Sequence, residues 1–311
     1  MPTVPPIGMI ATTVEIAQRT IEIAREMDMA DMVSTQVGYL HDGLAIATRM
    51  AEEGAEVLIS RRATTVLIEE TLDIPNVTLP VTLEDLSLAL SKARAATRVK
   101  SPRIGIFVMP SAQADVEAFT HHLGLDLRIY PVITDADYLY RMVDWAIADK
   151  MDVLIAGALV ATYANERNLP CVLMDSGPIA LRNALQEARR IVHGRKLEQM
   201  RAENFRIVVD TSYQGILVLD AAQNIAVANP AAHGILVNAS IEVGTGFSSV
   251  LPELDLAPCF NGGEKIHNLF LSTASGPLVL DATPAMVDNA VRGVVVSFQP
   301  AESVTELGTS T

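Results

Sequence analysis

A short apolar run, a polar turn and an amphipathic helix follow one another repeatedly in the N-terminal part of the chain. Apolar runs rich in β-branched residues stand at 7–11, 57–59, 104–108 and 153–155. Runs of this length without polar alternation are typical of strands that are buried on both faces of a parallel sheet. Because helical segments lie between consecutive runs, the pattern predicts βαβ units and doubly wound α/β lobes.

The α/β pattern occurs twice, which predicts two lobes. We expect the first lobe at residues 1–81 and the second at 100–177, with one crossing helix at 82–98. Thr82 and Asp85 have the spacing of a capping box at the start of that helix. The predicted fold class of the N-terminal domain, residues 1–195, is therefore a two-lobed doubly wound α/β fold, either flavodoxin-like or periplasmic-binding-protein-like.

A connecting helix is expected at residues 179–208. Between 182 and 206 the sequence has seven basic residues against three acidic ones, which in an acidic chain resembles a nucleic-acid-binding arm. We interpret the segment 179–208 instead as a solvated linker helix that pairs with its copy in a dimer. Its apolar residues have the 4-3-4 spacing of a coiled-coil seam. That seam consists of Leu181, Leu185, Ala188 and Val192.

The segment 209–300 has the alternation and the turn residues of an antiparallel sheet. Strands are expected at 215–220 and 225–228, and three more between 265 and 299. A short helix should begin near residue 229, which gives an α+β domain. The last residues, 301–311, are expected to form a frayed tail.

Charge and composition exclude several classes of protein. The net charge is −14, from 23 basic and 37 acidic residues, so the overall field does not favour nucleic acid. The N-terminus has no basic, apolar signal pattern, and the longest apolar run, 153–161, is too short to span a bilayer. With only two cysteines in separate segments, we expect a cytoplasmic protein that does not bind membranes.

The strongest candidate for a binding site is the polar turn after the run at 57–59. It contains Ser60, Arg61, Arg62, Thr64 and Thr65. Open α/β sheets bind ligands at the carboxyl ends of their strands, and free N–H groups at a helix start favour an anion. Because arginine has a fork geometry that fits carboxylate or phosphate, this turn predicts an anion site.

Other predicted strand exits provide further candidates, each with a structural alternative. Thr12 is either a hydroxyl in the cleft or a helix cap, and Gly157 either admits a ligand or eases packing. Ser176 and Gly177 form either a second anion site or a simple helix start before Pro178. The predicted ligand-binding set therefore includes all four of these residues beside the arginine turn.

The segment 209–300 resembles a PAS domain. The resemblance rests on residues 213–220, on the Asn-Pro-Ala-Ala segment at 229–232, and on the final strand at 293–298. PAS domains dimerise and relay signals through flanking helices. No flavin-type cysteine motif or haem-type histidine spacing occurs here, so we expect a relay or dimer module without a cofactor.

The N-terminal domain has family-like residues at 57–61 and 153–157, together with Thr64, Ser176, Gly177, Ile179, Ala184, Leu185 and Ala188. By these residues it resembles the sensor domain of the propionate catabolism activators, which are sigma-54-dependent transcription regulators. The order of sensor, basic helix and PAS domain is also that of the family. The resemblance implies a sensor that binds a small carboxylate metabolite such as 2-methylcitrate and thereby relieves the inhibition of an attached ATPase.

The sequence departs from the family pattern after Arg61. Many relatives have two glycines where this chain has Arg62 and Ala63, which predicts a smaller or more anionic ligand than 2-methylcitrate. No Gly-x-x-x-x-Gly-Lys motif occurs, and the sequence at 244–246 lacks the lysine that phosphates require. DNA and sigma-54 RNA polymerase are thus expected to be reached only through output domains outside this chain.

The main alternative is a cysteine-dependent racemase or decarboxylase, since such enzymes also have two α/β lobes. They need a thiolate at a strand exit in the cleft. Cys171 stands inside an apolar run and Cys259 lies in the PAS-like part. A dinucleotide-dependent oxidoreductase would need a Gly-x-Gly-x-x-Gly turn, which follows no strand. We therefore predict a protein with no catalytic residues and no metal site.

Overall fold

The fold is seen in a computed structural model that describes residues 4–122, 127–133, 135–288 and 290–302. Most of the predicted tail at 301–311 therefore lies outside the described residues. Within the described ranges, no helix combines the length and the apolar character that crossing a bilayer requires.

The chain divides into two compact units, residues 1–196 and 197–311. The first unit begins with a four-stranded parallel sheet in the order β2-β1-β3-β4. The central strands β1 and β3 are buried on both faces, as their continuous apolar runs predict. The elements of this first lobe are β1 (Ile7–Ala11), α1 (Val14–Glu26), β2 (Val33–Val37), α2 (Leu40–Glu53), β3 (Val57–Arg61), α3 (Arg62–Thr71) and β4 (Asn76–Leu79).

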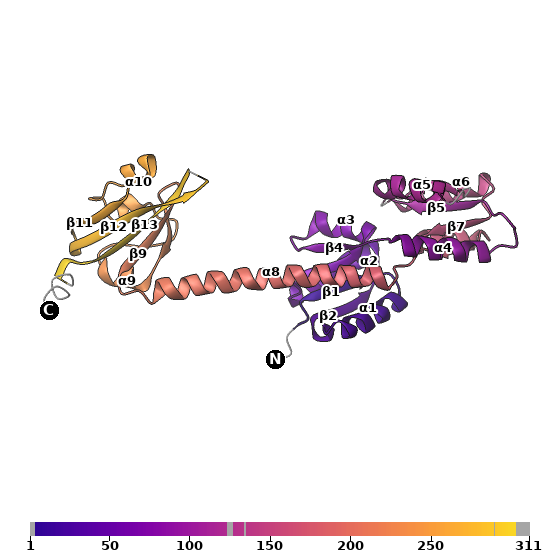
Figure 1. Cartoon of the computed structure of the whole chain (residues 1–311), viewed down its shortest axis with the longest axis horizontal. Helices are drawn as coiled ribbons and strands as arrows, with labels where there is room; N and C mark the ends of the chain where they lie inside the picture. Colours follow the sequence, from indigo (N-terminus) through magenta and orange to yellow (C-terminus); the bar gives the residue numbers. More distant parts are fainter. Residues whose placement is uncertain (1–3, 123–126, 134, 289, 303–311) are drawn as a thin grey trace. The chain divides into compact units, whose positions relative to one another are not determined.

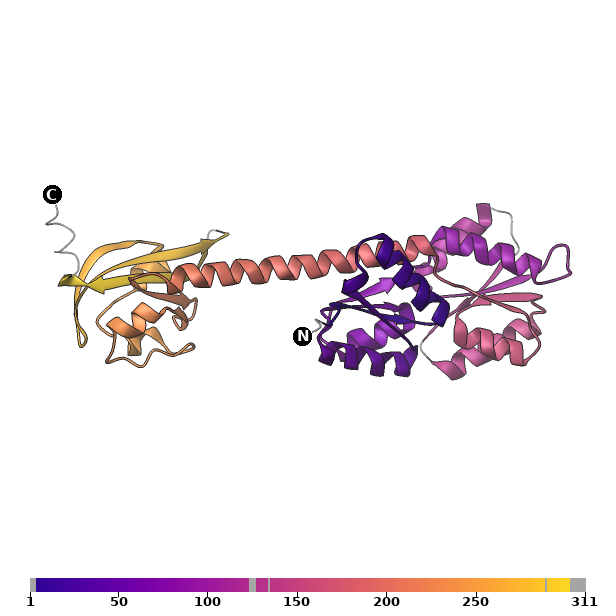
Figure 2. The same cartoon turned by 90° about the horizontal axis from the view of Figure 1, so that it is seen from below.

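The second lobe repeats the first. Its parallel sheet has the order β6-β5-β7-β8, so the two lobes have equivalent strand orders and helices on both faces (Figure 2). The prediction of two doubly wound lobes is confirmed. The elements are β5 (Ile104–Val108), α5 (Gln113–His122), β6 (Leu127–Pro131), α6 (Ala136–Ala148), β7 (Val153–Ala156), α7 (Ala158–Glu166) and β8 (Cys171–Leu173).

The lobes exchange helices in both directions. Helix α4 (Leu83–Ala95) follows the last strand of the first lobe, but Leu86 and Leu90 pack in the second lobe against Ile104. Helix α8 (Pro178–Asp210) follows the last strand of the second lobe, and its first turns pack on the first lobe (Figure 1). The sequence predicted one crossing helix, whereas the structure has two reciprocal ones.

This exchange corrects the interpretation of the 4-3-4 seam. Leu181, Leu185, Ala188 and Val192 are at most 7% exposed and belong to the core that contains β1, β3 and α1. A dimer seam at these positions is therefore wrong. A helix that covers a sheet and a helix in a coiled coil need the same apolar stripe, so the spacing alone does not distinguish them.

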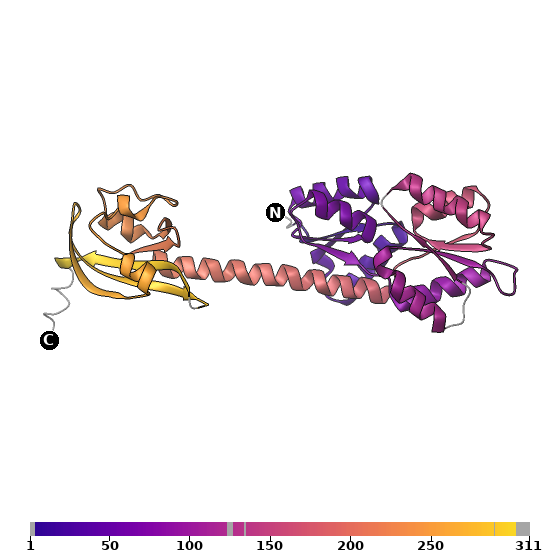
Figure 3. The same cartoon turned by 90° about the horizontal axis from the view of Figure 1, so that it is seen from above.

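The second unit contains a five-stranded antiparallel sheet in the order β10-β9-β13-β12-β11. Short helices and loops lie on one face of this sheet (Figure 3). Numbered from its own first strand, the sheet order is 2-1-5-4-3, which is the PAS topology and confirms the predicted fold. The elements are β9 (Gly215–Asp220), β10 (Ile225–Ala228), α9 (Pro230–Ile235), α10 (Ala257–Gly262), β11 (Ile266–Thr273), β12 (Gly276–Val287) and β13 (Ala290–Pro300).

Asn229 joins the end of α8 to this sheet. Its side-chain oxygen accepts hydrogen bonds from the backbone N–H groups of Ile216 and Ala232, at 2.8 and 2.9 Å. Its amide group donates to the carbonyl oxygens of Val209 and Gln214, at 3.0 and 2.9 Å. Since Asn229 is fully buried and both its donor hydrogens and its oxygen are used, it fixes the exit of α8 relative to β9 and α9.

Gly293 is needed because β13 passes very close to β9. A Cβ atom at this position would lie 2.2 Å from the carbonyl oxygen of Leu219, which is a backbone atom and cannot turn away. We expect Gly293→Ala to destabilise the PAS domain by about 1–3 kcal/mol, as overpacking typically does. Urea unfolding followed by circular dichroism measures this, with Gly234→Ala as control, because a Cβ at Gly234 meets no atom within 4 Å. Equal midpoints for the two variants would contradict the prediction.

Candidate ligand-binding site

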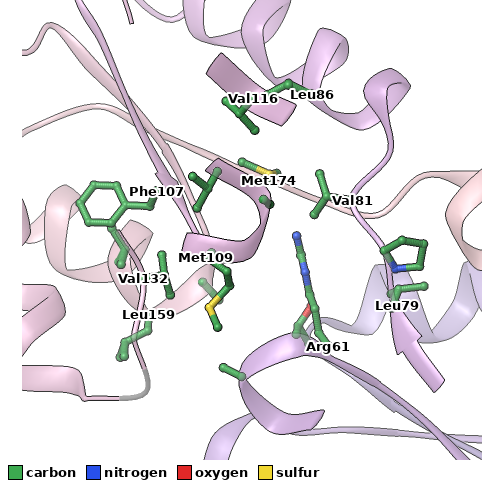
Figure 4. Close-up of a pocket in the computed structure, with 18 of the residues that line it drawn as sticks. Arg61, Leu79, Val81, Leu86, Phe107, Met109, Val116, Val132, Leu159 and Met174 are labelled. Atoms are coloured by element: carbon green, nitrogen blue, oxygen red, sulfur yellow. The ribbon is translucent and has the colours of Figure 1, made fainter. Parts of the chain in front are cut away.

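A cleft of about 740 Å³ lies between the two lobes. It is lined by the residues that follow the two central strands of each sheet, together with the start of α4 (Figure 4). These residues are Thr12 after β1, Arg61 at the end of β3, Met109 after β5 and Gly157 after β7. Since the strand order reverses between these strands, both lobes contribute their topological switch points, where open α/β sheets bind ligands.

The two sides of the cleft differ in chemistry. Every polar side chain among the described lining residues comes from the first lobe or from the start of α4, namely Thr12, Tyr39, Arg61, Thr64 and Thr82. The described lining residues of the second lobe are all apolar: Phe107, Val108, Met109, Ala112, Val116, Ala118, Phe119, Val132, Ile133, Leu139, Gly157, Ala158, Leu159, Val160 and Met174.

Arg61 is the one charged side chain among the described lining residues. Its guanidinium group points into the cleft (Figure 4). Burial lowers the pKa of Arg61, while the charges of Asp175 and Asp85 act in the opposite direction. Because an arginine pKa lies far above 7, the group stays protonated. The guanidinium group of Arg61 forms no hydrogen bond, and no ion pair within 4 Å, with any other described residue.

The start of α3 adds to the positive field of Arg61. Arg61 is the N-cap residue of α3, and its own side chain makes no capping hydrogen bond to that helix. Ala63 and Thr64, in the first turn, line the cleft. A helix start with free N–H groups attracts an anion, so the charge and the helix dipole act together. The side chain of Arg62, the second predicted arginine, lies outside the part of the structure that is described.

The hydroxyl groups of the predicted turn are used within the first lobe. The Ser60 and Thr65 hydroxyls lie 2.9 Å apart, and Ser60 also contacts the side chain of Asn76. Ser60 and Thr65 are both buried, and neither is among the described residues that line the cleft. Thr64 lines the cleft, and its hydroxyl accepts a 2.9 Å hydrogen bond from the N–H of Leu40. These contacts hold the turn that presents Arg61.

Thr12 and Gly157 both reach the cleft. Thr13, and not Thr12, caps α1 by accepting from the N–H of Ile16 at 3.3 Å, which leaves Thr12 among the lining residues. A Cβ added at Gly157 would meet no atom within 4 Å. The backbone of Gly157 therefore borders open space on the second-lobe side of the cleft.

Ser176 and Gly177 lie outside the described lining and close to a buried carboxylate. Gly177 donates its N–H to Asp85 Oδ1 at 2.6 Å, and Thr82 donates its N–H to Asp85 Oδ2 at 2.8 Å. The predicted capping box of Thr82 and Asp85 is confirmed. The sequence predicted either a bound anion or a simple helix start at Ser176 and Gly177. In the structure, the carboxylate of Asp85 supplies the negative charge at this helix start. The Ser176 hydroxyl is buried and has no hydrogen-bond partner among the described residues.

From the second-lobe wall, sequence reasoning identified the exits of β5 and β7, Gly157 included, but it did not identify Tyr39, Leu40 or the remaining apolar side chains of that wall. Tyr39 and Leu40 follow β2, which lies beside β1 in the sheet. Ligands bind at the carboxyl ends of parallel strands, which is the rule that predicted Thr12 and Arg61. The same rule applies to the residues after β2, so Tyr39 and Leu40 could have been predicted from the sequence. The remaining side chains of the apolar wall had no such signal, because they have the composition of core.

The cysteines do not have the environment of a catalytic thiolate. Neither is among the described residues that line the cleft. Burial raises the pKa of the Cys171 thiol to about 12, so this group is protonated near neutral pH. Cys259 is fully buried in the PAS core. These environments weigh against the alternative of a cysteine-dependent racemase or decarboxylase.

Two solved structures match parts of this chain. An NtrC family transcriptional regulator from Clostridium acetobutylicum matches with a TM-score of 0.53 and 20% identity, covering 61% of this chain and 97% of that one. At this identity the match shows the fold alone. The PAS domain of nitrogen regulation protein NR(II) from Vibrio parahaemolyticus matches with a TM-score of 0.23 and 21% identity, covering 30% of this chain and 95% of that one.

Comparison with curated proteins finds no significant match. Comparison with protein-family models matches residues 27–198 to the family described as propionate catabolism activator. The matched segment spans more than half of the chain and contains most of both lobes, helix α4, the first part of α8, and Arg61. This chain belongs to the propionate catabolism activator family, as a sensory and regulatory domain followed by a PAS domain.

Proposed function

We propose that this chain is the signal-sensing region of a cytoplasmic sigma-54-dependent transcriptional regulator. Residues 1–195 bind a small anionic carboxylate metabolite in the cleft between the lobes. The helix at 179–208 and the PAS domain at 209–300 relay the change to an ATPase and DNA-binding output. In this proposal the protein does no chemistry on the ligand.

The observation that supports a carboxylate ligand is the position of Arg61. A largely buried cation that has no ion pair within 4 Å among the described residues gains most when an anion of matching geometry reaches it. The start of α3 favours the same charge. Of the predicted ligand-binding residues, Thr12, Arg61, Thr64 and Gly157 line the cleft, and we propose them as the site.

The route of the relay follows from the two segments that join the lobes. One runs from β4 to α4 and the other from β8 to α8, and Asp85 bonds to both through Thr82 and Gly177. A ligand that closes the lobes changes the angle between these segments at the start of α8. Its effect is limited by the difference between its affinities for the open and closed states.

We propose that the protein is a homodimer through the far part of α8 and the PAS domain. Beyond the turns that pack on the first lobe, α8 exposes Leu197, Met200, Phe205 and Val208, each at least 39%. A second copy would remove these side chains from water. The dimer contact proposed here thus lies further along the helix than the sequence predicted.

A thermal-shift screen of the whole chain against small carboxylates tests the proposed function. The panel contains mono-, di- and tricarboxylates, citrate and 2-methylcitrate included, with inorganic phosphate alongside. A ligand at 100 times its dissociation constant stabilises the folded state by about 2.7 kcal/mol, which is an easily measured shift. A shift with at least one carboxylate that Arg61→Gln removes is the expected result. No shift with any acid would contradict the proposal.

A further inference from the structure

We infer that the ligand of the interlobe cleft is a monocarboxylic acid with a hydrocarbon body, and not a di- or tricarboxylate. This inference deepens the proposed function and rests on it. It follows from the number of charges at the cleft and from the side chains of the second-lobe wall.

The described lining of the cleft contains a single cation. Arg61 is the single charged side chain among the described lining residues, and the remaining polar groups there are the hydroxyls of Thr12, Tyr39, Thr64 and Thr82. One guanidinium forms a bidentate contact with one carboxylate. A second or third carboxylate in the cleft would have no cation among these residues, and an unpaired buried charge is strongly unfavourable.

Two carboxylates act on the charge of Arg61. The charges of Asp175 and Asp85 favour the protonated guanidinium. Asp85 is 4% exposed and both its oxygens accept hydrogen bonds, so it is fixed in place. Neither of the two carboxylates is among the described lining residues, and their charges add a repulsion that grows with each negative charge on the ligand. A ligand with a single negative charge meets the least repulsion.

The second-lobe wall of the cleft is apolar. Phe107, Met109, Val132, Leu159 and Met174 belong to this wall and stand apart from Arg61, on the other side of the cleft (Figure 4). A hydrocarbon chain or ring placed against them gains roughly 25 cal/mol for each Å² of apolar surface removed from water. The cleft volume of about 740 Å³ falls within the usual range for small-molecule sites. The cleft therefore fits an amphipathic acid, with its carboxylate on the first lobe and its body on the second.

Octanoate and octanedioate form a matched pair of probes, because they differ only in a carboxylate at the far end of the chain. Isothermal titration of the whole chain with octanoate, octanedioate, citrate and octanamide separates charge from apolar burial. We expect octanoate to bind at least tenfold more tightly than each of the other three. Arg61→Gln should weaken octanoate binding at least tenfold. Arg182→Gln is the matched control, since Arg182 pairs with Glu26 on the exposed surface of the first lobe.

The outcomes separate this inference from the function on which it rests. If citrate or octanedioate binds as tightly as octanoate and Arg61→Gln removes that binding, the carboxylate sensor stands and the hydrocarbon ligand is wrong. If no acid binds, or if Arg61→Gln binds octanoate like the natural chain, both the site and the ligand class are wrong.

A charge added at Gly157 provides a second, independent test. Because the space at Gly157 is open, Gly157→Arg places a cation on the second-lobe side without displacing an atom at Cβ. We expect this variant to bind octanedioate at least tenfold more tightly than the natural chain does. Gly157→Leu, which adds bulk without charge, should not. An unchanged preference for octanoate in Gly157→Arg would mean that the ligand body does not lie against the second lobe.

Discussion

Replacement of Arg61 by Gln is expected to weaken carboxylate binding roughly ten- to hundredfold. A hydrogen bond to a charged group contributes about 1.5–3 kcal/mol, and Arg61 is the one cation among the described residues that line the cleft. Glutamine keeps polarity and similar length but has neither the charge nor the fork of donors. Isothermal titration with the carboxylate found in the thermal-shift screen measures the change directly.

Arg61→Lys provides a graded comparison for this prediction. Lysine keeps the charge and loses the bidentate geometry, so its affinity should fall between those of the natural chain and Arg61→Gln. Circular dichroism establishes that the variants are folded. An affinity within twofold of the natural chain for both variants would show that the anion lies elsewhere.

Replacement of Asp85 by Ala is expected to destabilise the first unit by about 2–4 kcal/mol. The change removes the acceptors of two N–H groups, those of Thr82 and Gly177, at a site that is 4% exposed. Loss of the capping-box bond to the N–H of Thr82 accounts for about 1 kcal/mol, and the N–H of Gly177, left without its partner, adds about 1–3 kcal/mol. Chemical denaturation of the whole chain measures the loss as a shift of the midpoint of its N-terminal transition.

Asp152→Ala is the matched control. Asp152 accepts a single hydrogen bond from the N–H of Arg103 at 2.7 Å, at an exposed position. Water replaces that acceptor, so the expected loss is below about 1 kcal/mol. Equal losses at the two positions would mean that the bonds of Asp85 to both connecting segments contribute nothing beyond an ordinary surface contact.

The strands of both lobes were predictable because parallel strands buried on both faces need uninterrupted apolar runs. The expected strands at 7–11 and 104–108 coincide with β1 and β5. Strand order and the reciprocal exchange of α4 and α8 were not predictable in the same way. The apolar stripe of α8 fits a sheet, a partner helix or a second copy equally well, and only long-range packing decides between them.

The candidate site was predictable where polar residues follow apolar strands. Arg61 and Thr12 reach the cleft as that rule predicts, while Ser60 and Thr65 form hydrogen bonds inside the first lobe. The rule gives the position of a residue along the chain and not the direction of its side chain. Most of the apolar wall was missed for a different reason, since the sequence does not distinguish an aliphatic side chain facing a cavity from one facing the core.

The exchange of helices also sets an order of events during synthesis of the chain. Strand β4 ends at Leu79, and the helix that completes the core of the first lobe begins at Pro178. At about 5–20 residues per second, roughly 5–20 s pass before the ribosome delivers that helix. During this interval the part of the first sheet that Leu181 and Leu185 later cover remains exposed on the nascent chain. The first lobe therefore reaches its native core only after the second lobe has been made, and until then it presents an apolar surface to chaperones.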